Sequence, residues 1–251
     1  ANGNLDQTTD ALGRIADNNY DPLNRLSRTL QDMNGIAAET KFTYDALDNL
    51  VQVNDPKLLN TTYTYNGFSD LKQLVSPDTG TTSYTYDSAG NLVSQTDARG
   101  KVANYAYDAL NRLTSVIYPT ATTLNTAYTW DTTQAACQAG ETFTASRPAK
   151  IVDGSGNTVY CYDRFGRIVR KVQTTNGKAF TLRYTWNTSG QLTSTIYPDG
   201  AIVDYLYDAQ GRVSEIGAKT SAGTRQVLIT AVSYHPFGPA ADWRYGSGSG
   251  R

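Results

Sequence analysis

The sequence predicts an all-β protein made of antiparallel β-hairpin repeats of about 21 residues, joined into one continuous curling sheet. An aromatic residue recurs at a nearly constant spacing, a second aromatic usually stands two residues before it, and Asp or Asn usually follows it. Residues two apart share a face only in an extended strand. Asp and Asn side chains start turns because they bond their own backbone two residues on. Each unit therefore has the pattern strand, tight turn, strand.

The recurring aromatic, called the anchor below, defines the repeat. Four consecutive anchors, from Tyr44 to Tyr107, lie 21 residues apart, and the step from Trp186 to Tyr207 has the same length. The step after Trp130 is the longest, at 32 residues. The complete set is Tyr20, Tyr44, Tyr65, Tyr86, Tyr107, Trp130, Tyr162, Trp186, Tyr207 and Tyr234.

The residues after each anchor predict a hairpin turn. The fourth is usually Gly, Asn or Asp, the types that tolerate a positive φ, with Ser69 and Gln134 as exceptions. The sixth is usually Leu, Ile or Val, where the return strand begins. The aspartates that we expect to cap these turns are Asp21, Asp45, Asp87, Asp108, Asp163 and Asp208.

The number of strands and the composition both argue against a compact sandwich. Ten anchors imply about 20 strands in meander order, whereas open twisted sheets rarely exceed about 10 without curling or closing. Exposed edges also invite pairing with other chains. Leu, Ile, Val and Phe make up only about 19% of the chain, while Thr and Tyr, which favour half-exposed sheet surfaces, are abundant. We therefore expect a sheet that spirals into a strip or shell.

Departures from the repeat spacing divide the chain into segments. Residues 1–118 are regular repeats after a degenerate first one, TTDALGRI, in which Thr9 replaces the anchor. Residues 119–160 form an irregular repeat with a loop insertion, which we interpret as a lengthened hairpin loop, with a plug or partner-binding loop as the alternative. Residues 161–238 are regular again, and residues 239–251, ending in GSGSG and Arg, are expected to be a tail or linker.

The two cysteines lie in and near this insertion. Cys161 stands between two tyrosines of one strand, so it should face the opposite side of the sheet, and Cys137 lies in the loop 24 residues earlier. A disulfide that pins the loop to the sheet and a pair of free thiols are both compatible with this spacing.

Composition and motifs exclude several classes of function. The net charge is −1 and the basic residues are scattered, which argues against a nucleic-acid partner. No apolar run is long enough to span a bilayer, and no signal peptide opens the sequence. His235, the only histidine, excludes a multi-histidine metal site. The aspartates recur beside their own turns, so we assign no catalytic, cofactor or metal residue and expect no enzyme.

Three phrases carry a resemblance to a known family: YDSAGNL (residues 86–92), YDRFGRI (162–168) and YDAQGRV (207–213). With their spacing, they resemble the Tyr-Asp (YD) repeat of Rhs proteins, which Tc-toxin BC components, wall-associated bacterial proteins and teneurins share. The resemblance covers nearly the whole chain. It implies a β-strip that spirals into a hollow shell enclosing a toxic C-terminal polypeptide, within a larger exported bacterial protein that is secreted or at the cell surface.

Two functions follow from these patterns. The first is a structural segment of such a shell, with the enclosed toxin or effector or further repeats of the same protein as partners. The alternative is a carbohydrate- or protein-binding cell-surface module that uses rows of Tyr and Trp, with Trp130 and Trp186 as candidates for ligand stacking.

Overall fold

The computed structural model describes residues 3–246 and shows an all-β protein. Twenty-one strands, β1 to β21, and one short 3₁₀ helix, η1 (Thr122–Leu124), account for its regular structure. The strand pairs are antiparallel hairpins joined in chain order, which confirms the predicted fold class. The chain divides into two compact units, residues 1–122 and 123–251, which are described separately.

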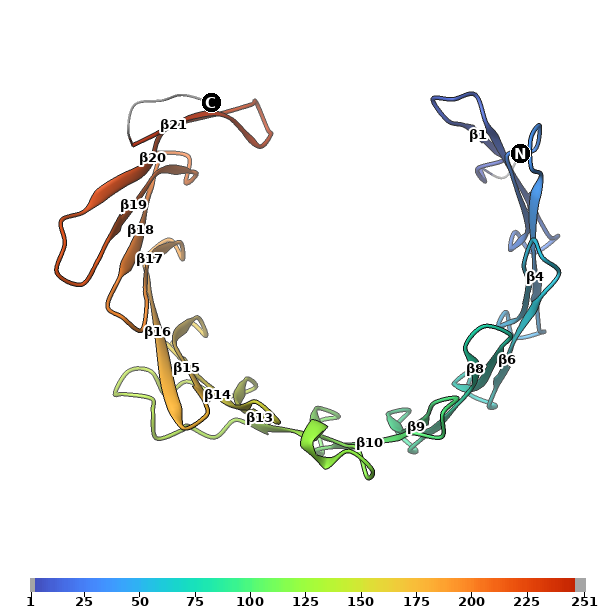
Figure 1. Cartoon of the computed structure of the whole chain (residues 1–251), viewed down its shortest axis with the longest axis horizontal. Coiled ribbons are helices and arrows are strands. Elements are labelled where there is room, and N and C mark those ends of the chain that lie inside the picture. The colour runs from blue at the N-terminus through green and yellow to red at the C-terminus, as the bar shows by residue number, and fades with distance from the viewer. Residues whose placement is uncertain (1–2, 247–251) are drawn as a thin grey trace. The chain divides into compact units, whose positions relative to one another are not determined.

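The first unit is a meander in which each strand pairs with the next along the chain, as Figure 1 shows from β1 (blue) to β10 (green). Its strands are β1 (Gln7–Thr9), β2 (Ile15–Tyr20), β3 (Leu26–Gln31), β4 (Ala38–Tyr44), β5 (Leu50–Asn54), β6 (Asn60–Tyr65), β7 (Leu71–Ser76), β8 (Gly80–Tyr86), β9 (Leu92–Thr96), β10 (Val102–Tyr107) and β11 (Leu113–Ile117).

The second unit continues the same pattern with longer hairpins. Its strands are β12 (Thr126–Trp130), β13 (Pro148–Asp153), β14 (Gly156–Tyr162), β15 (Ile168–Thr175), β16 (Lys178–Trp186), β17 (Leu192–Ile196), β18 (Ile202–Tyr207), β19 (Val213–Lys219), β20 (Gln226–Tyr234) and β21 (Ala240–Tyr245). Each anchor in both units ends its strand, as the sequence predicts.

A β-bulge lies beside the turn that follows each of these anchors. In the β4–β5 hairpin, Tyr44 pairs with Leu50 and Thr43 pairs with Gln52, so Val51 is an extra residue. The same shift occurs beside Tyr65, Tyr86 and Tyr107. A bulge increases local twist and re-aims the strand. Its repetition therefore gives every hairpin the same bend.

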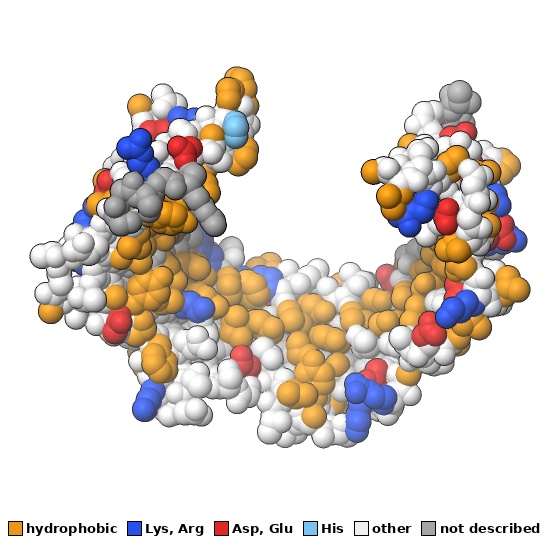
Figure 2. Space-filling model, turned by 45° about the horizontal axis from the view of Figure 1, so that its top comes forward, with side chains coloured by type: hydrophobic (Ala, Val, Ile, Leu, Met, Phe, Trp, Pro, Cys, Tyr) orange, Lys and Arg blue, Asp and Glu red, His pale blue; other side chains and the backbone are white. Residues whose placement is uncertain are grey.

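The two faces of the sheet differ in character. In β4, Phe42 and Tyr44 share the anchor face and are half-buried, whereas Lys41 and Thr43 point to the other face and are exposed. The strand β8 repeats this division between Tyr84 and its neighbour Thr85. Figure 2 shows hydrophobic side chains over much of the visible surface.

The sheet is a single layer with very little buried interior. Its solvent-accessible area is 15747 Å² for a mass of 27.3 kDa, whereas a compact monomer of that mass exposes about 10,900 Å². Among the described residues, the buried hydrophobic ones are Ala103, Ala149, Val159, Cys161 and Tyr162. Contacts between successive hairpins must therefore hold the fold together, since residues 3–246 form no second layer over the sheet.

The C-terminal end of the described chain differs from the expected division. Residues 240–245, which we expected in the tail, form strand β21, because the turn after Tyr234 closes one more hairpin against β20. In that turn Phe237, not Gly238, takes the positive φ. Residues 247–251 of the predicted tail or linker lie outside the described residues. At the other end, the degenerate repeat forms the β1–β2 hairpin around Asp10.

Ser69 provides a test of the turn geometry. It has a φ of 65°, a conformation that favours Gly because Gly has no Cβ to clash. We expect Ser69→Gly to raise the free energy of unfolding by roughly 0.5–1 kcal/mol, measured by urea denaturation. Ser88→Gly is the matched control, since Ser88 is also an exposed turn serine and is not among the positive-φ residues. A loss of stability at both positions would contradict the turn assignment.

Candidate functional site

The most regular polar feature of the chain is the turn that follows each anchor, called the YD turn below. It spans five residues beginning with the Asp or Asn, as in residues 45–49. The Asp45 Oδ1 accepts the backbone N–H groups of Leu47 at 2.8 Å and Asn49 at 2.9 Å. The backbone N–H of Asp45 donates to the Asn49 carbonyl at 2.9 Å. A carboxylate that accepts these two N–H groups fixes the loop.

The predicted caps all occupy this position. The Oδ1 atoms of Asp21, Asp87, Asp108, Asp163 and Asp208 accept the N–H groups two and four residues on, at 2.8–3.0 Å. The prediction named these residues but not their partner.

The side chain of the fifth turn residue pairs with the cap, and the sequence prediction did not include it. The Arg112 guanidinium donates to Asp108 Oδ2 at 2.8 Å, and the Asn49 amide donates to Asp45 Oδ2 at 2.9 Å. Where Asn replaces the turn Asp, the direction reverses: Asn66 donates to Asp70 at 2.8 Å. The sequence contains this signal. Four residues after each Asp cap stands a side chain that can donate a hydrogen bond, whereas Asp70 and Gln191 stand four residues after the two Asn caps.

These contacts keep the caps ionised. The Asn49 amide hydrogen bond, with the two backbone N–H groups, holds the pKa of Asp45 below its ordinary value. At Asp108 the hydrogen bond from the Arg112 side chain is the largest of the effects that lower the pKa. The caps therefore remain charged acceptors at neutral pH, as structural elements rather than proton donors.

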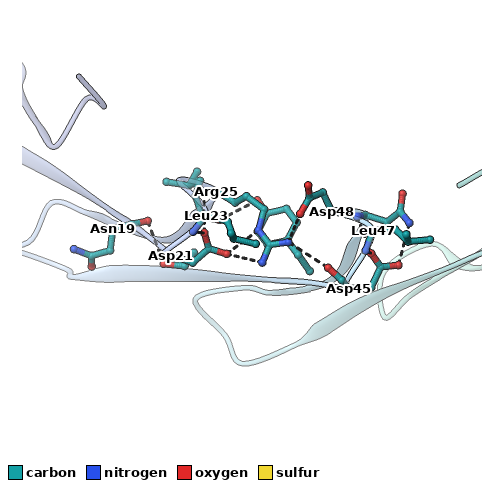
Figure 3. A network of polar contacts seen from close by, with 11 residues as sticks. Asn19, Asp21, Leu23, Arg25, Asp45, Leu47 and Asp48 are labelled. Atoms are coloured by element: carbon teal, nitrogen blue, oxygen red, sulfur yellow. Dashed lines mark hydrogen bonds and ion pairs between the residues drawn. The ribbon is translucent and has the colours of Figure 1, made fainter. Parts of the chain in front are cut away.

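The YD turns lie at one end of the strands, and this end of the sheet is called the rim below. The arginine of a YD turn also contacts the next YD turn along this rim. In Figure 3, Arg25 lies between its own cap Asp21 and the following turn. Its Nη1 donates to the Asp45 carbonyl at 3.2 Å and to Asp48 Oδ1 at 2.5 Å. Its guanidinium carbon lies 4.7 Å from the centre of the Tyr44 ring, within cation–π range.

Other arginines at the same position repeat this stacking. Arg167 lies 5.7 Å from the Trp186 ring and Arg212 lies 4.5 Å from the Tyr234 ring. Each of these guanidiniums therefore links one hairpin to the anchor of the next.

The anchors form the second link between hairpins. The Tyr44 hydroxyl donates to the Leu26 carbonyl at 2.9 Å, which is the first residue of the return strand in the preceding repeat. Corresponding bonds of 2.7–3.1 Å join Tyr65 to Leu50, Tyr107 to Leu92, Tyr162 to Pro148, Trp186 to Ile168, Tyr207 to Leu192 and Tyr234 to Val213, while Tyr20 donates to Leu5. The tyrosines are therefore structural donors.

The loop insertion replaces the YD turn after Trp130. Residues 131–147 lie between the paired residues Trp130 and Pro148. A disulfide joins Cys137 to Cys161, with their Cα atoms 5.4 Å apart. Because Cys161 faces away from the anchors, the disulfide fixes the loop on the opposite face of β14.

Two further contacts hold this loop. Glu141 forms a bidentate ion pair with Arg170 at 2.7 and 2.8 Å, and the Arg170 side chain is only 6% exposed. Arg147, which directly precedes the return strand, lies 5.8 Å from the Tyr162 ring. The arginine contact of a regular turn is therefore kept despite the insertion.

The other residues considered for chemistry have structural surroundings. The backbone N–H of His235 donates to the Pro239 carbonyl, in the place of a turn Asp. Among the described residues, no group of three or more His, Cys, Asp or Glu is arranged to hold a metal ion. No helix in the described part of the chain is long and apolar enough to cross a membrane.

The pairing of cap and fifth residue is testable at Asp163 and Arg167, whose side chains are 16% and 23% exposed. Asp163→Asn places an amide donor against a guanidinium, so we expect a loss of about 1 kcal/mol in unfolding free energy. The double variant Asp163→Asn/Arg167→Gln recreates the natural pair of Asn187 and Gln191, and should recover most of this loss. Additive losses in chemical denaturation would contradict the pairing.

The disulfide makes a second test. Mass spectrometry after alkylation without reduction should find Cys137 and Cys161 unlabelled, and labelling of both would refute the bond. Closing a loop with a sequence separation of 24 contributes about 3 kcal/mol by restricting the unfolded chain, so reduction should lower stability by that order. Cys137→Ser should be milder than Cys161→Ser, because the Cys161 side chain is fully buried.

Comparisons with known proteins agree with this architecture. A model of the RHS repeat matches residues 65–102, 86–123 and 180–225. No curated protein matches the sequence. The crystal structure of TcdB2-TccC3-Cdc42 is similar, with a TM-score of 0.78 and 19% identity over 94% of this chain. The Photorhabdus luminescens Tc holotoxin pore gives a TM-score of 0.77 and 19% identity over 93%.

The chain spans only 13% of the length of each of these solved chains. At this identity, the likeness shows a common fold. Together with the three repeat matches, which cover residues 65–123 and 180–225, it confirms the resemblance drawn from the sequence: the chain contains RHS repeats and shares the fold of these Tc-toxin structures.

Proposed function

We propose that the chain is a structural segment of an Rhs-repeat shell that encloses a toxin or effector polypeptide belonging to the same longer protein. The observation that carries this proposal is the use of the repeated polar residues. The Asp caps bind their own turns, and the anchor hydroxyls bind the preceding hairpin. Because these repeated polar groups are used to hold the sheet together, the proposed role is containment.

The thin sheet supports a role within a larger assembly. A single layer exposes both of its faces, and the rim that carries the YD turns is lined with apolar side chains. The third residue of the turn is repeatedly a large, exposed hydrophobic residue: in the first unit Leu23, Leu47, Phe68 and Leu110 are 67%, 64%, 89% and 68% exposed. Apolar rows of this kind mark surfaces that contact other protein. We propose that further repeats of the longer protein cover this rim.

The proposal also includes export. A shell that delivers a toxic polypeptide acts outside the producing cell, so we place the longer protein among secreted or cell-surface bacterial proteins. The similar Tc toxin structures support this placement by their fold.

The geometry does not favour the glycan-binding alternative at Trp186. Its indole N–H donates to the Ile168 carbonyl at 2.9 Å, and Arg167 lies over its ring. A sugar that stacked on this ring would have to displace the guanidinium. Trp130 pairs with Pro148 beside the loop insertion and ends strand β12 in the same way as the other anchors.

Containment can be tested by protease protection in the longer protein that carries this segment. We expect the enclosed polypeptide to resist protease in the intact protein. Thr85→Pro should expose it, because Thr85 lies inside β8, opposite Ser94 of β9, where proline removes a ladder donor and distorts the strand.

Thr85→Ser is the matched control, since it keeps the backbone donor and the polar character of the exposed face. Equal protease resistance of the proline variant and the control would argue against containment. Rapid cleavage of the intact protein's C-terminal polypeptide would do the same.

A further inference from the structure

One gap between successive YD turns differs from the others. A groove of about 620 Å³ opens between residues 66–70 and 87–90. Its lining includes Phe68, Asp70, Lys72, Tyr84 and Tyr86. Phe68 and Asp70 belong to the turn before β7, Lys72 lies in β7, and Tyr84 and Tyr86 lie in β8, all within the first unit.

In the corresponding gap two repeats earlier, between the turns at residues 21–25 and 45–49, an arginine fills the space. Arg25 pairs with its cap Asp21, stacks on the Tyr44 ring at 4.7 Å and donates to the Asp45 carbonyl at 3.2 Å. The gap therefore presents three features to a guanidinium: a carboxylate, an aromatic face and a backbone carbonyl. Figure 3 shows the polar part of this arrangement, with Arg25 between Asp21 and Asp45.

The groove keeps these three features but has lost the guanidinium. Asp70 takes the position of Arg25, so the carboxylate has moved to the other end of the pair, where Asn66 holds it at 2.8 Å. Tyr86 supplies the ring and Asp87 the carbonyl. In the other YD turns that begin with Asp or Asn, this position holds Arg (residues 25, 112, 167 and 212), Asn (49 and 91) or Gln (191), whereas here it holds an acid.

The anchor beside the groove is also exceptional. Among the anchors in the described part of the first unit, Tyr86 alone makes no hydroxyl hydrogen bond to the preceding repeat, whereas Tyr20, Tyr44, Tyr65 and Tyr107 do. Burial and the nearby charge of Asp70 raise the pKa of the Tyr86 hydroxyl. The ring therefore carries neither of the two inter-hairpin contacts that other anchors make.

We propose that this groove binds the guanidinium of an arginine presented by another protein segment. The incoming guanidinium would pair with Asp70, stack on Tyr86 and donate to the Asp87 carbonyl, in the place that Arg25 occupies in its own gap. Arg fits better than Lys because its planar group can stack on a ring and donate to several acceptors at the same time.

Lys72 lines the same groove and must be considered. It is exposed, and among the described residues it forms no ion pair with Asp70. Its charge would repel an incoming cation. Lys72→Gln should therefore strengthen the binding of a cation and have no such effect on a neutral ligand.

The test uses capped arginine, N-acetyl-arginine methylamide, with capped citrulline as the uncharged control of nearly the same shape. Each is titrated into the ¹⁵N-labelled chain, and the backbone amides of Ser88, Ala89 and Gly90 report on the groove. We expect saturable shifts in the millimolar range with arginine and none with citrulline. Asp70→Asn should weaken binding about fivefold or more.

Two variants separate a specific site from a general charge effect. Asp78→Asn removes the same charge from an exposed turn outside the groove and should leave binding unchanged. Asn66→Asp/Asp70→Arg recreates the pair of Asp21 and Arg25, so it should fill the groove from within, abolish binding and raise the thermal unfolding temperature.

Equal shifts with arginine and citrulline would overturn the proposal and indicate a groove for neutral ligands. Unchanged arginine binding in Asp70→Asn, or persistent binding in the double variant, would overturn it as well. Containment in the longer protein does not depend on this site, so the protease experiment and this titration can fail independently.

Discussion

The structure depends on the carboxylate or amide oxygen that begins each YD turn. A tight turn leaves backbone N–H groups without strand partners, and unpaired polar groups are costly where water is restricted. The Oδ1 of Asp45 accepts two of them, and Oδ2 takes the side chain of the fifth residue. One side chain thus fixes the turn, and the bulge beside it sets the bend of the hairpin. A layer with so little buried apolar area needs such local order at every repeat.

Stability between repeats comes from neighbours only. The Tyr44 hydroxyl reaches the preceding return strand, and Arg25 reaches the following turn, so each hairpin is tied to the one on either side. In repeat proteins of this kind, stability is approximately a sum of unit and nearest-neighbour contributions. Irregular units are then tolerated where both inter-hairpin contacts persist, namely the hydrogen bond of the anchor and the contact of the arginine. The insertion after Trp130 shows this, because Tyr162 still donates to Pro148 and Arg147 still stacks on Tyr162.

The sequence predicts the strands and the caps because period-two aromatics and turn residues are local signals. It does not reveal the Tyr44–Leu26 bond, since that contact depends on how two hairpins lie side by side. The pairing of the first and fifth turn residues is also a local sequence signal. Where Asn66 replaces the turn Asp, the acceptor Asp70 replaces the usual donor at the fifth position. The path of the loop around Cys137 has no periodicity, so the spacing alone left the thiol and the disulfide equally open. Strand β21 was missed because glycine-rich sequence follows it closely.

Positions that depart from the regular repeat are informative. Where most repeats follow the same pattern, a residue that departs from it is informative, because local conflicts of this kind tend to mark functional positions. Asp70 is such a residue: it keeps the hydrogen bond within its turn but gives up the tie to the next anchor that an arginine would make. The insertion at residues 131–147 is the opposite case, because the Glu141–Arg170 pair and the disulfide add ties of their own. Without an arginine at position 70, the groove keeps acceptor groups that no side chain fills. The ion pair and the disulfide at the loop instead add contacts that stabilise it. The groove is therefore a better candidate for recognition than the loop.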